Sequence, residues 1–144
     1  MSRWIALASL SATLAFPPAL HAQAANDVPA AQAAANQWLT VTDAGQAVQS
    51  WEQASSLFRN TLTASAWGDA LQKARDPLGA VKSRELKSAT YTRTLPGAPQ
   101  GEYVVIQYES RFERVSTSMI ETITPMREAD GSWKVSGYFI RPAR

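Results

Sequence analysis

Two glutamates of the predicted sheet, Glu109 and Glu121, are the best candidates for acid–base chemistry in this sequence. The strand register argued below places them opposite each other, with Arg111 one step along the diagonal. Opposed carboxylates repel, so one of them could keep its proton to a higher pH and act as a general acid or base. The alternative interpretation is a solvated sheet face, on which Arg111 and Lys134 balance the charge.

A second group of side chains could bind a ligand. Four hydroxyl groups are expected to be neighbours within the apolar face of the sheet: Tyr108, Ser110, Thr122 and Thr124. A buried hydroxyl needs a partner, which a ligand or a water in a polar-lined cavity would supply, and Trp51 could add an aromatic wall. The alternative is ordinary composition, because threonine and tyrosine favour strands and tryptophans at helical spacing usually belong to the core.

The composition excludes several classes of chemistry. The chain has no cysteine and one histidine, His21, which lies in a segment that we expect to be removed. Disulfides, thiolate metal sites, cysteine nucleophiles and Ser-His-Asp arrangements are therefore excluded from the mature chain. The sequence has no P-loop, no GxGxxG motif and no dense basic cluster. We expect no cofactor, no bound metal ion and no nucleic-acid partner.

The first 24 residues have the features of a secretory signal peptide. Arg3 is followed by a mostly apolar, uncharged segment, two prolines, and the small-residue site Ala22-Gln23-Ala24. The apolar segment is shorter than the roughly 20 residues that a membrane span needs, and no later segment is apolar enough to cross a bilayer. We expect an exported, periplasmic or secreted protein, with residues 25–144 forming one domain.

The periodicity of the mature chain predicts helices first and strands afterwards. Apolar residues recur at helical spacing up to Pro77, and alternate from there onward. Three helices are expected: one from Asp27 to about Thr40 with Pro29 in its first turn, one capped by Asp43 and continuing to Phe58, and one from Thr63 to Asp76. The four expected strands cover residues 81–95, 102–114, 117–127 and 133–140.

The turns between these strands predict their register. Asp130-Gly131 is read as a two-residue hairpin turn with positive φ at both positions, which pairs Thr122 with Phe139. An equally tight turn near Val115 would pair Tyr108 with Thr122. One face of the sheet would then be apolar, carrying Val104, Ile106, Tyr108, Phe112, Ile120, Met126, Trp133, Val135 and Phe139. The expected fold is α+β, with three N-terminal helices packed on one face of a curved four-stranded antiparallel sheet.

Several runs carry a resemblance to a known family: Val41-Thr42-Asp43-Ala44-Gly45, Ser50-Trp51-Glu52-Gln53-Ala54, Glu121-Thr122-Ile123-Thr124-Pro125 and Trp133-Lys134-Val135-Ser136-Gly137-Tyr138. Over about residues 30–141 the sequence resembles an uncharacterised exported bacterial family, domain of unknown function 4019. Its closing Gly-x-Trp-Lys-Val strand is also similar to the NTF2-like (SnoaL-like) superfamily. That likeness implies an NTF2-like or cystatin-like cone, with helices in the concavity of the sheet. The family has no established activity, so the resemblance implies export and fold but no catalytic residue.

These observations favour a small exported binding or accessory domain without enzymatic activity. It would hold a small ligand or an envelope protein in the cone. One alternative is a hydrolase or isomerase that uses carboxylates on an NTF2-like scaffold, and another is a structural interaction module of the envelope. The ligand, the partner and the oligomeric state are left open by the sequence.

The mature chain is predicted to begin at Ala25, because the small-residue site ends at Ala24 and the two prolines precede it. Cleavage after Ala22 is the second choice. The intact mass of the exported protein measures the position of its N-terminus. A mass that retains residues 1–22 would contradict the signal-peptide interpretation.

Overall fold

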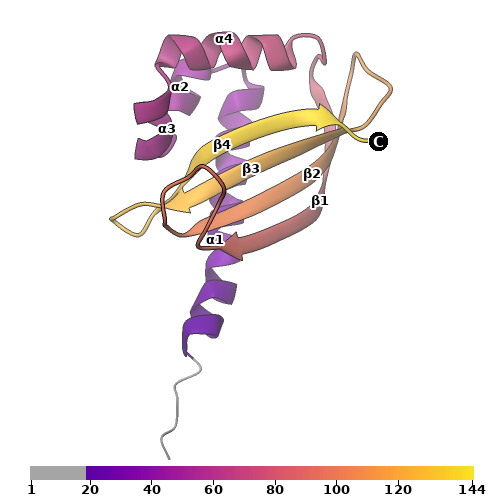
Figure 1. Ribbon diagram of the computed structural model, residues 1–144. Coiled ribbons are helices and arrows are strands. Elements are labelled where there is room, and N and C mark those ends of the chain that lie inside the picture. The colour runs from indigo at the N-terminus through magenta and orange to yellow at the C-terminus, as the bar shows by residue number, and fades with distance from the viewer. Residues whose placement is uncertain (1–18) are drawn as a thin grey trace, which may run out of the picture.

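The computed structural model describes the backbone of residues 19–144 and the side chains from Asp27 onward (Figure 1). Within this range four helices precede four strands: α1 (Ala19–Asp43), α2 (Ala47–Glu52), α3 (Ser56–Thr61), α4 (Ala64–Arg75), β1 (Val81–Thr92), β2 (Tyr103–Phe112), β3 (Met119–Arg127) and β4 (Trp133–Pro142). The predicted α+β class is confirmed. Residues 1–18, most of the predicted signal peptide, lie outside the described part of the chain.

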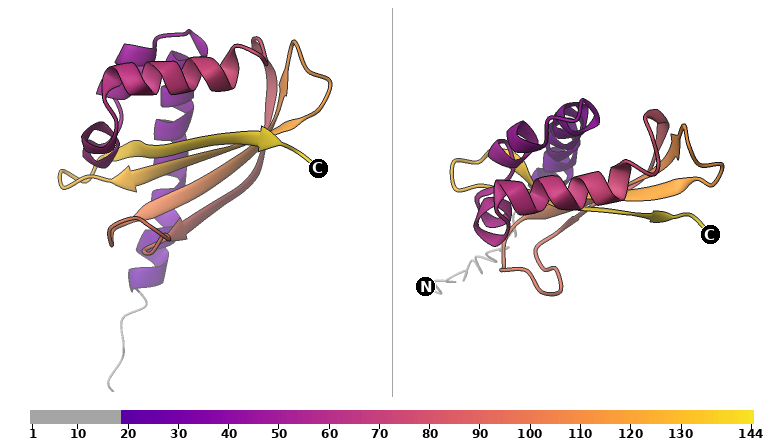
Figure 2. Two further views of the ribbon diagram at one scale, coloured as in Figure 1. Left: turned by 45° about the horizontal axis from the view of Figure 1, so that its top comes forward. Right: turned by 90° about the horizontal axis from the view of Figure 1, so that it is seen from above.

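The strands form one antiparallel sheet in the order β1-β2-β3-β4, which is curved but not closed (Figure 2). Helix α1 crosses one face of this sheet, here called the inner face, and contacts all four strands. Helix α4 packs on α2 and reaches the sheet through two long side chains, Trp67 and Arg75. Among the described residues, no helix is both long and apolar enough to cross a membrane.

The core lies between α1 and the inner face. Ala31 and Ala35 are fully buried on α1, and their small side chains allow close approach of the helix to the sheet. Trp67 of α4 stacks edge-on against Phe58, with ring centroids 5.0 Å apart, and lies 5.7 Å from Trp38. The indole N–H groups of Trp38 and Trp67 donate to the backbone oxygen and the hydroxyl of Ser50, at 2.8 and 2.9 Å. These two tryptophans are therefore core residues.

The helix boundaries differ from the prediction at two places. Helix α1 begins at Ala19 and passes through Pro29, so Asp27 does not start it. The expected second helix is divided into α2 and α3, because the backbone N–H of Ser55 donates to the carbonyl of Val135 on β4, at 2.8 Å. Ser55 then caps α3 by accepting from the N–H of Phe58. The chain leaves helical geometry where it touches the edge of the sheet.

The hairpin between β3 and β4 is one residue longer than predicted. The N–H of Glu128 donates to the carbonyl of Ser132, so three residues lie in the loop instead of two. Gly131 has φ of 85°, as a three-residue loop requires, but Asp130 does not have the predicted positive φ. Asp130 instead accepts hydrogen bonds from the backbone N–H and hydroxyl of Ser132 through one carboxylate oxygen.

A β-bulge at Ser136 then exchanges the two faces of β4, so that from this residue onward each side chain points to the opposite face from the one predicted by alternation. Thr124 pairs with Gly137 and Pro125 with Val135, which leaves Ser136 as an extra residue. Val135 is buried on the inner face, and beyond the bulge Tyr138 also faces the helices, with its ring 5.7 Å from Trp38. Phe139 pairs with Thr122 as predicted but is 72% exposed, so its predicted burial is wrong.

The register between β2 and β3 is also one residue from the predicted one. Tyr108 pairs with Glu121, not with Thr122. Ser110 pairs with Met119, so the connection between the paired residues is one residue shorter than the predicted register requires. The inner face of β3 therefore carries Met119, Glu121 and Ile123. Four residues assigned to the apolar face are not fully buried: Ile120, Met126 and Trp133 are partly exposed, and Phe139 is exposed.

Gly131→Val should lower the free energy of unfolding by about 2 kcal/mol, because a β-branched residue is strained at positive φ. The nearest side-chain atom to an added Cβ is 3.9 Å away, so the cost is one of backbone conformation. Denaturant midpoints of the variant and wild type measure it. Gly131→Asn is the control and should cost less, since asparagine tolerates this region; equal midpoints for Gly131→Val and wild type would contradict the loop geometry.

Candidate functional site

A buried carboxylate, Glu121, lies at the centre of a network of charged and hydroxyl side chains. Its side chain has no exposed surface. Arg84 binds it with two nitrogens, Nε to Oε2 at 2.6 Å and Nη2 to Oε1 at 3.0 Å. The hydroxyl of Tyr138 donates to Oε1 at 2.7 Å, and the hydroxyl of Ser110 donates to Oε2. These four donors occupy the four acceptor positions of the carboxylate.

The sheet register brings these residues together. Arg84 on β1 pairs with Ser110 on β2, and its side chain extends over this small residue to Glu121 on β3. Tyr138 reaches Glu121 from β4 because the bulge at Ser136 turns it toward the helices. All four strands thus contribute one side chain to the network.

The ends of two helices complete the network. Asp43, the last residue of α1, accepts hydrogen bonds from Arg84 and, at 2.8 Å, from Arg75, the last residue of α4. Arg75 also donates to the hydroxyl of Tyr138 at 3.3 Å and lies over the ring of Phe112, with its guanidinium carbon 5.0 Å from the ring centroid. Asp43 therefore joins α1 to α4 and β1, and does not cap α2 as predicted; α2 has Gln46 at its N-cap without a side-chain hydrogen bond.

The electrostatics of the network favour the charged form of every ionic member. Burial alone would raise the pKa of Glu121, but the hydrogen bonds and charge of Arg84, with Ser110 and Tyr138, outweigh burial and hold that pKa below its ordinary value. The pKa of Asp43 is lowered in the same way: the effect of burial is overcome by Arg84 and Arg75. Burial opposes the charge of Arg84, but its hydrogen bonds to Asp43 and Glu121 raise its pKa. Two arginines thus neutralise two carboxylates.

This geometry makes Glu121 a structural carboxylate. A general acid at neutral pH needs a raised pKa, and a general base needs a free lone pair directed at a substrate. Glu121 has a lowered pKa, and its acceptor positions are all occupied by protein donors. The network therefore holds the sheet and the helices together.

Glu109, the other candidate catalytic residue, lies on the outer face of the sheet, away from Glu121. Its partner across β1 and β2 is Glu85, so an opposed carboxylate pair exists, but between different strands than predicted. Lys87 lies between the two, with its Nζ 3.2 Å from Glu109 and 3.6 Å from Glu85. The predicted facing of Glu109 and Glu121 is wrong because the β2–β3 register differs by one residue. Lys87 lowers the pKa of Glu109, which fits a solvated ion pair.

The five residues of the predicted ligand pocket do not converge. Tyr108 and Ser110 are buried on the inner face and donate to Asn36 and Glu121. Thr122 is on the outer face beside Gln107, and Thr124 is buried next to the bulge. Trp51 is on α2, where its indole N–H donates to the carbonyl of Leu62 at 2.7 Å. The hydroxyls of Tyr108 and Ser110 are thus satisfied by protein partners, and none of the five residues lines either of the two hollows described below.

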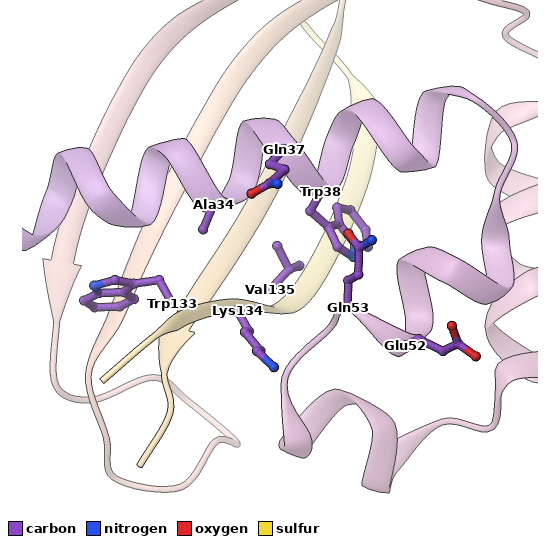
Figure 3. Close-up of a pocket in the computed structure, with 8 residues that line it drawn as sticks. All are labelled: Ala34, Gln37, Trp38, Glu52, Gln53, Trp133, Lys134 and Val135. Atoms are coloured by element: carbon purple, nitrogen blue, oxygen red, sulfur yellow. The ribbon is translucent and has the colours of Figure 1, made fainter. Parts of the chain in front are cut away.

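A hollow of about 350 Å³ lies instead between α1, the end of α2 and the start of β4 (Figure 3). Its apolar walls are Ala34, Trp38, Trp133 and Val135. Its polar residues are Gln37, Glu52, Gln53 and Lys134. In the described part of the chain, none of these four polar side chains makes a hydrogen bond or an ion pair with another protein group. Figure 3 shows Trp133 beneath Ala34 at one end, and Gln53 and Glu52 at the other.

A second hollow, of about 660 Å³, adjoins the ionic network near the ends of α1 and α4. Arg75, Asp43 and Arg114 line it, but Arg75 and Asp43 are bound to each other, and Arg114 donates to the carbonyl of Asp76 at 2.8 Å. Within residues 27–144 there is no cluster of three or more side chains of the types that coordinate metal ions. Arg75, Asp43 and Arg114 are therefore occupied by the fold, whereas the carboxylate of Asp76, which also lines this hollow, makes no hydrogen bond or ion pair in the described structure.

Sequence reasoning missed most of the network. The sequence pattern predicts Asp43 as a helix cap and predicts no buried partner for Arg84 or Arg75. The alternation of β1 does not reveal this, because register shifts between Val81 and Ser83 and between Leu86 and Ser88 put Arg84 out of step with the inward-packed Val81, Ala89 and Tyr91.

Glu121→Gln should lower the free energy of unfolding at pH 7 by about 3–5 kcal/mol, the usual cost of removing one partner of a buried ion pair. Because the folded-state pKa of Glu121 is depressed, its contribution is present above its ordinary pKa and is lost as pH falls through the lower folded value. The difference between variant and wild type should therefore shrink below about pH 4. Urea unfolding from pH 7 to pH 3 measures it.

Glu109→Gln is the matched control on the outer face and should leave the acid dependence of unfolding nearly unchanged. If Glu121→Gln were as stable as wild type at pH 7, the ion pair with Arg84 would not support the fold.

Comparison with known protein families identifies one family. No curated protein matches the chain. The model of a family described as protein of unknown function, DUF4019, matches residues 34–138. The matched span contains every residue of the ionic network, from Asp43 to Tyr138. The chain therefore belongs to the DUF4019 family.

Proposed function

We propose that this protein is an exported, non-enzymatic domain that binds a small ligand in the hollow between α1 and the start of β4. The observation that carries the proposal is the combination of a partly buried tryptophan, Trp133, with four polar side chains that have no protein partner in the described structure. Polar groups that converge on a concave apolar surface are the usual features of a ligand site. The volume of about 350 Å³ is at the lower end of the range for small molecules.

The rigid surroundings of the hollow support this proposal. Trp38 forms its inner wall and is held by stacking on Trp67 and by its hydrogen bond to Ser50. Val135 is held by the backbone bond from Ser55. A site whose walls do not rearrange loses little conformational freedom on binding, which favours affinity.

The state of the buried carboxylate supports a binding role over catalysis. The runner-up hypothesis, a hydrolase or isomerase using Glu109 and Glu121, requires these groups to act on one substrate. They lie on opposite faces of the sheet, and Glu121 is saturated by protein donors. Neither residue lines the hollow.

Export is proposed from the N-terminal sequence. The charged start, apolar segment and Ala22-Gln23-Ala24 site support cleavage after Ala24, which leaves Asp27 near the new N-terminus. Asp27 forms an ion pair with Arg127 at 3.2 Å, so the domain would be anchored to the sheet within three residues of the cleavage site. An NTF2-like cone remains the proposed superfamily, supported by a curved sheet with a long helix across its inner face.

Ala34→Leu should abolish ligand binding without unfolding the protein, because Ala34 points into the hollow and leucine is a good helix former. Thermal shift of the purified protein with a library of metabolites and envelope components measures binding, since a ligand of the native state raises the apparent melting temperature. Ala33→Leu is the matched control, because Ala33 is exposed on α1 and does not line the hollow.

Compounds that stabilise wild type and Ala33→Leu but not Ala34→Leu support the proposal. If no compound stabilises the wild type, or if those that do stabilise Ala34→Leu equally, this hollow is not the binding site.

A further inference from the structure

We infer that the ligand of this hollow is a short uncharged saccharide, with one sugar ring lying against Trp133. This inference rests on the proposed function, and it adds the chemical class of the ligand. It is carried by the tryptophan, by the two glutamine amides and by the balance of charge around the hollow.

Trp133 differs from the other described tryptophans in its hydrogen bonding. The indole N–H groups of Trp38, Trp51 and Trp67 all donate to protein oxygens. In the described structure the indole N–H of Trp133 has no protein acceptor, and its ring is partly exposed at one end of the hollow. Figure 3 shows its indole nitrogen on the side of the ring that is turned away from the other lining residues. The partly exposed ring can pack against the C–H face of a sugar, and its N–H can donate to a hydroxyl group at the outer edge of the hollow.

The two amides fit the hydroxyl groups of a sugar. Gln37 comes from α1, and Gln53 is the C-cap residue of α2, so the two approach the hollow from different elements. Each amide has two donors and one acceptor oxygen, and a hydroxyl also both donates and accepts. Neither amide makes a hydrogen bond within the described structure. A ligand with several hydroxyl or acetamido groups would satisfy both.

The charges of the hollow favour an uncharged ligand. Glu52 and Lys134 have opposite signs, and the other lining residues are neutral, so the hollow has no net charge. An anion or a cation would be attracted by one group and repelled by the other. A carboxylate and an ammonium group can instead accept from and donate to hydroxyls.

A zwitterionic dipeptide is the competing ligand, because its two ends could pair with Glu52 and Lys134. Such a ligand would leave the Trp133 ring and the Gln37 amide without a role. The saccharide uses the whole lining, and the experiment below includes the dipeptide as a separate arm.

The test is a titration of purified ¹⁵N-labelled protein with N,N′-diacetylchitobiose and with cellobiose, followed by the indole N–H resonances. Trp133→Phe identifies the Trp133 signal by its loss. We expect this signal to shift saturably with at least one disaccharide, while the three bonded indoles shift little. A loss of one hydrogen bond weakens binding about fivefold, which is the expected effect of Gln37→Ala and of Gln53→Ala.

Two controls separate the site from general effects on the fold. Gln49→Ala removes an exposed amide of α2 outside the hollow and should leave the dissociation constant unchanged. Trp133→Ala should weaken binding more than tenfold. Truncation of a tryptophan can also destabilise the protein. If Trp133→Ala does not fold, the test is decided by the Gln37→Ala and Gln53→Ala variants, because both glutamine side chains are exposed.

The outcomes distinguish this inference from the function on which it rests. One outcome is that glycylglycine binds saturably, that Ala34→Leu blocks this binding, and that no saccharide binds. This outcome would overturn the saccharide as the ligand but would support the hollow as a ligand site. Saccharide binding that is unchanged in both glutamine variants and in Ala34→Leu overturns the assignment to this hollow. Failure of both disaccharides, of the dipeptide and of the compound library overturns the saccharide and the proposed function together.

Discussion

The ion pair between Arg84 and Glu121 is the interaction on which the arrangement of the whole domain depends. It spans three strands, from β1 over Ser110 of β2 to β3, and Tyr138 extends it to β4. Through Asp43 the same arginine holds the end of α1, and through Arg75 the end of α4. A shift of β1 or β3 by one residue would leave a buried charge without its partner, at a cost of several kcal/mol. The network therefore selects one register for a sheet whose apolar pattern alone does not.

The ionic network and the proposed ligand site lie in different parts of the fold. The groups with the strongest electrostatic interactions are bound to one another at the ends of α1 and α4, and are not available to a substrate. The four polar side chains that line the first hollow, between α1, the end of α2 and the start of β4, have no protein partner in the described structure. They belong to a different part of the fold from the ionic network, and they are the groups on which the proposed ligand site rests.

The local sequence pattern was sufficient to predict the helices and strands, but it was not sufficient to predict how the strands pair. Thr63 and Ser55 cap their helices by accepting hydrogen bonds from the backbone of residues three positions later, a pattern that a sequence can reveal. The sequence predicted the helix start at Thr63. It did not predict the cap at Ser55, because Ser55 was assigned to the interior of a continuous helix. For β3 the two faces are almost equally apolar, with Ile120 and Met126 on one and Met119 and Ile123 on the other. The predicted register placed Glu121 on the solvated face, but Glu121 is buried, because Arg84, from a strand not adjacent to β3, neutralises it.

The sequence by itself determined the order of helices and strands, the α+β class, the family and the absence of cysteine chemistry, since these depend on composition and on periodicity along the chain. Tertiary structure alone decided which carboxylate is buried, which face Phe139 and Thr122 occupy, and where unpaired polar groups converge. These properties depend on one extra residue in the Asp130-Gly131 loop, one bulge at Ser136 and one ion pair between β1 and β3. Each shifts side chains by a single position, and in a strand a single position exchanges the two faces.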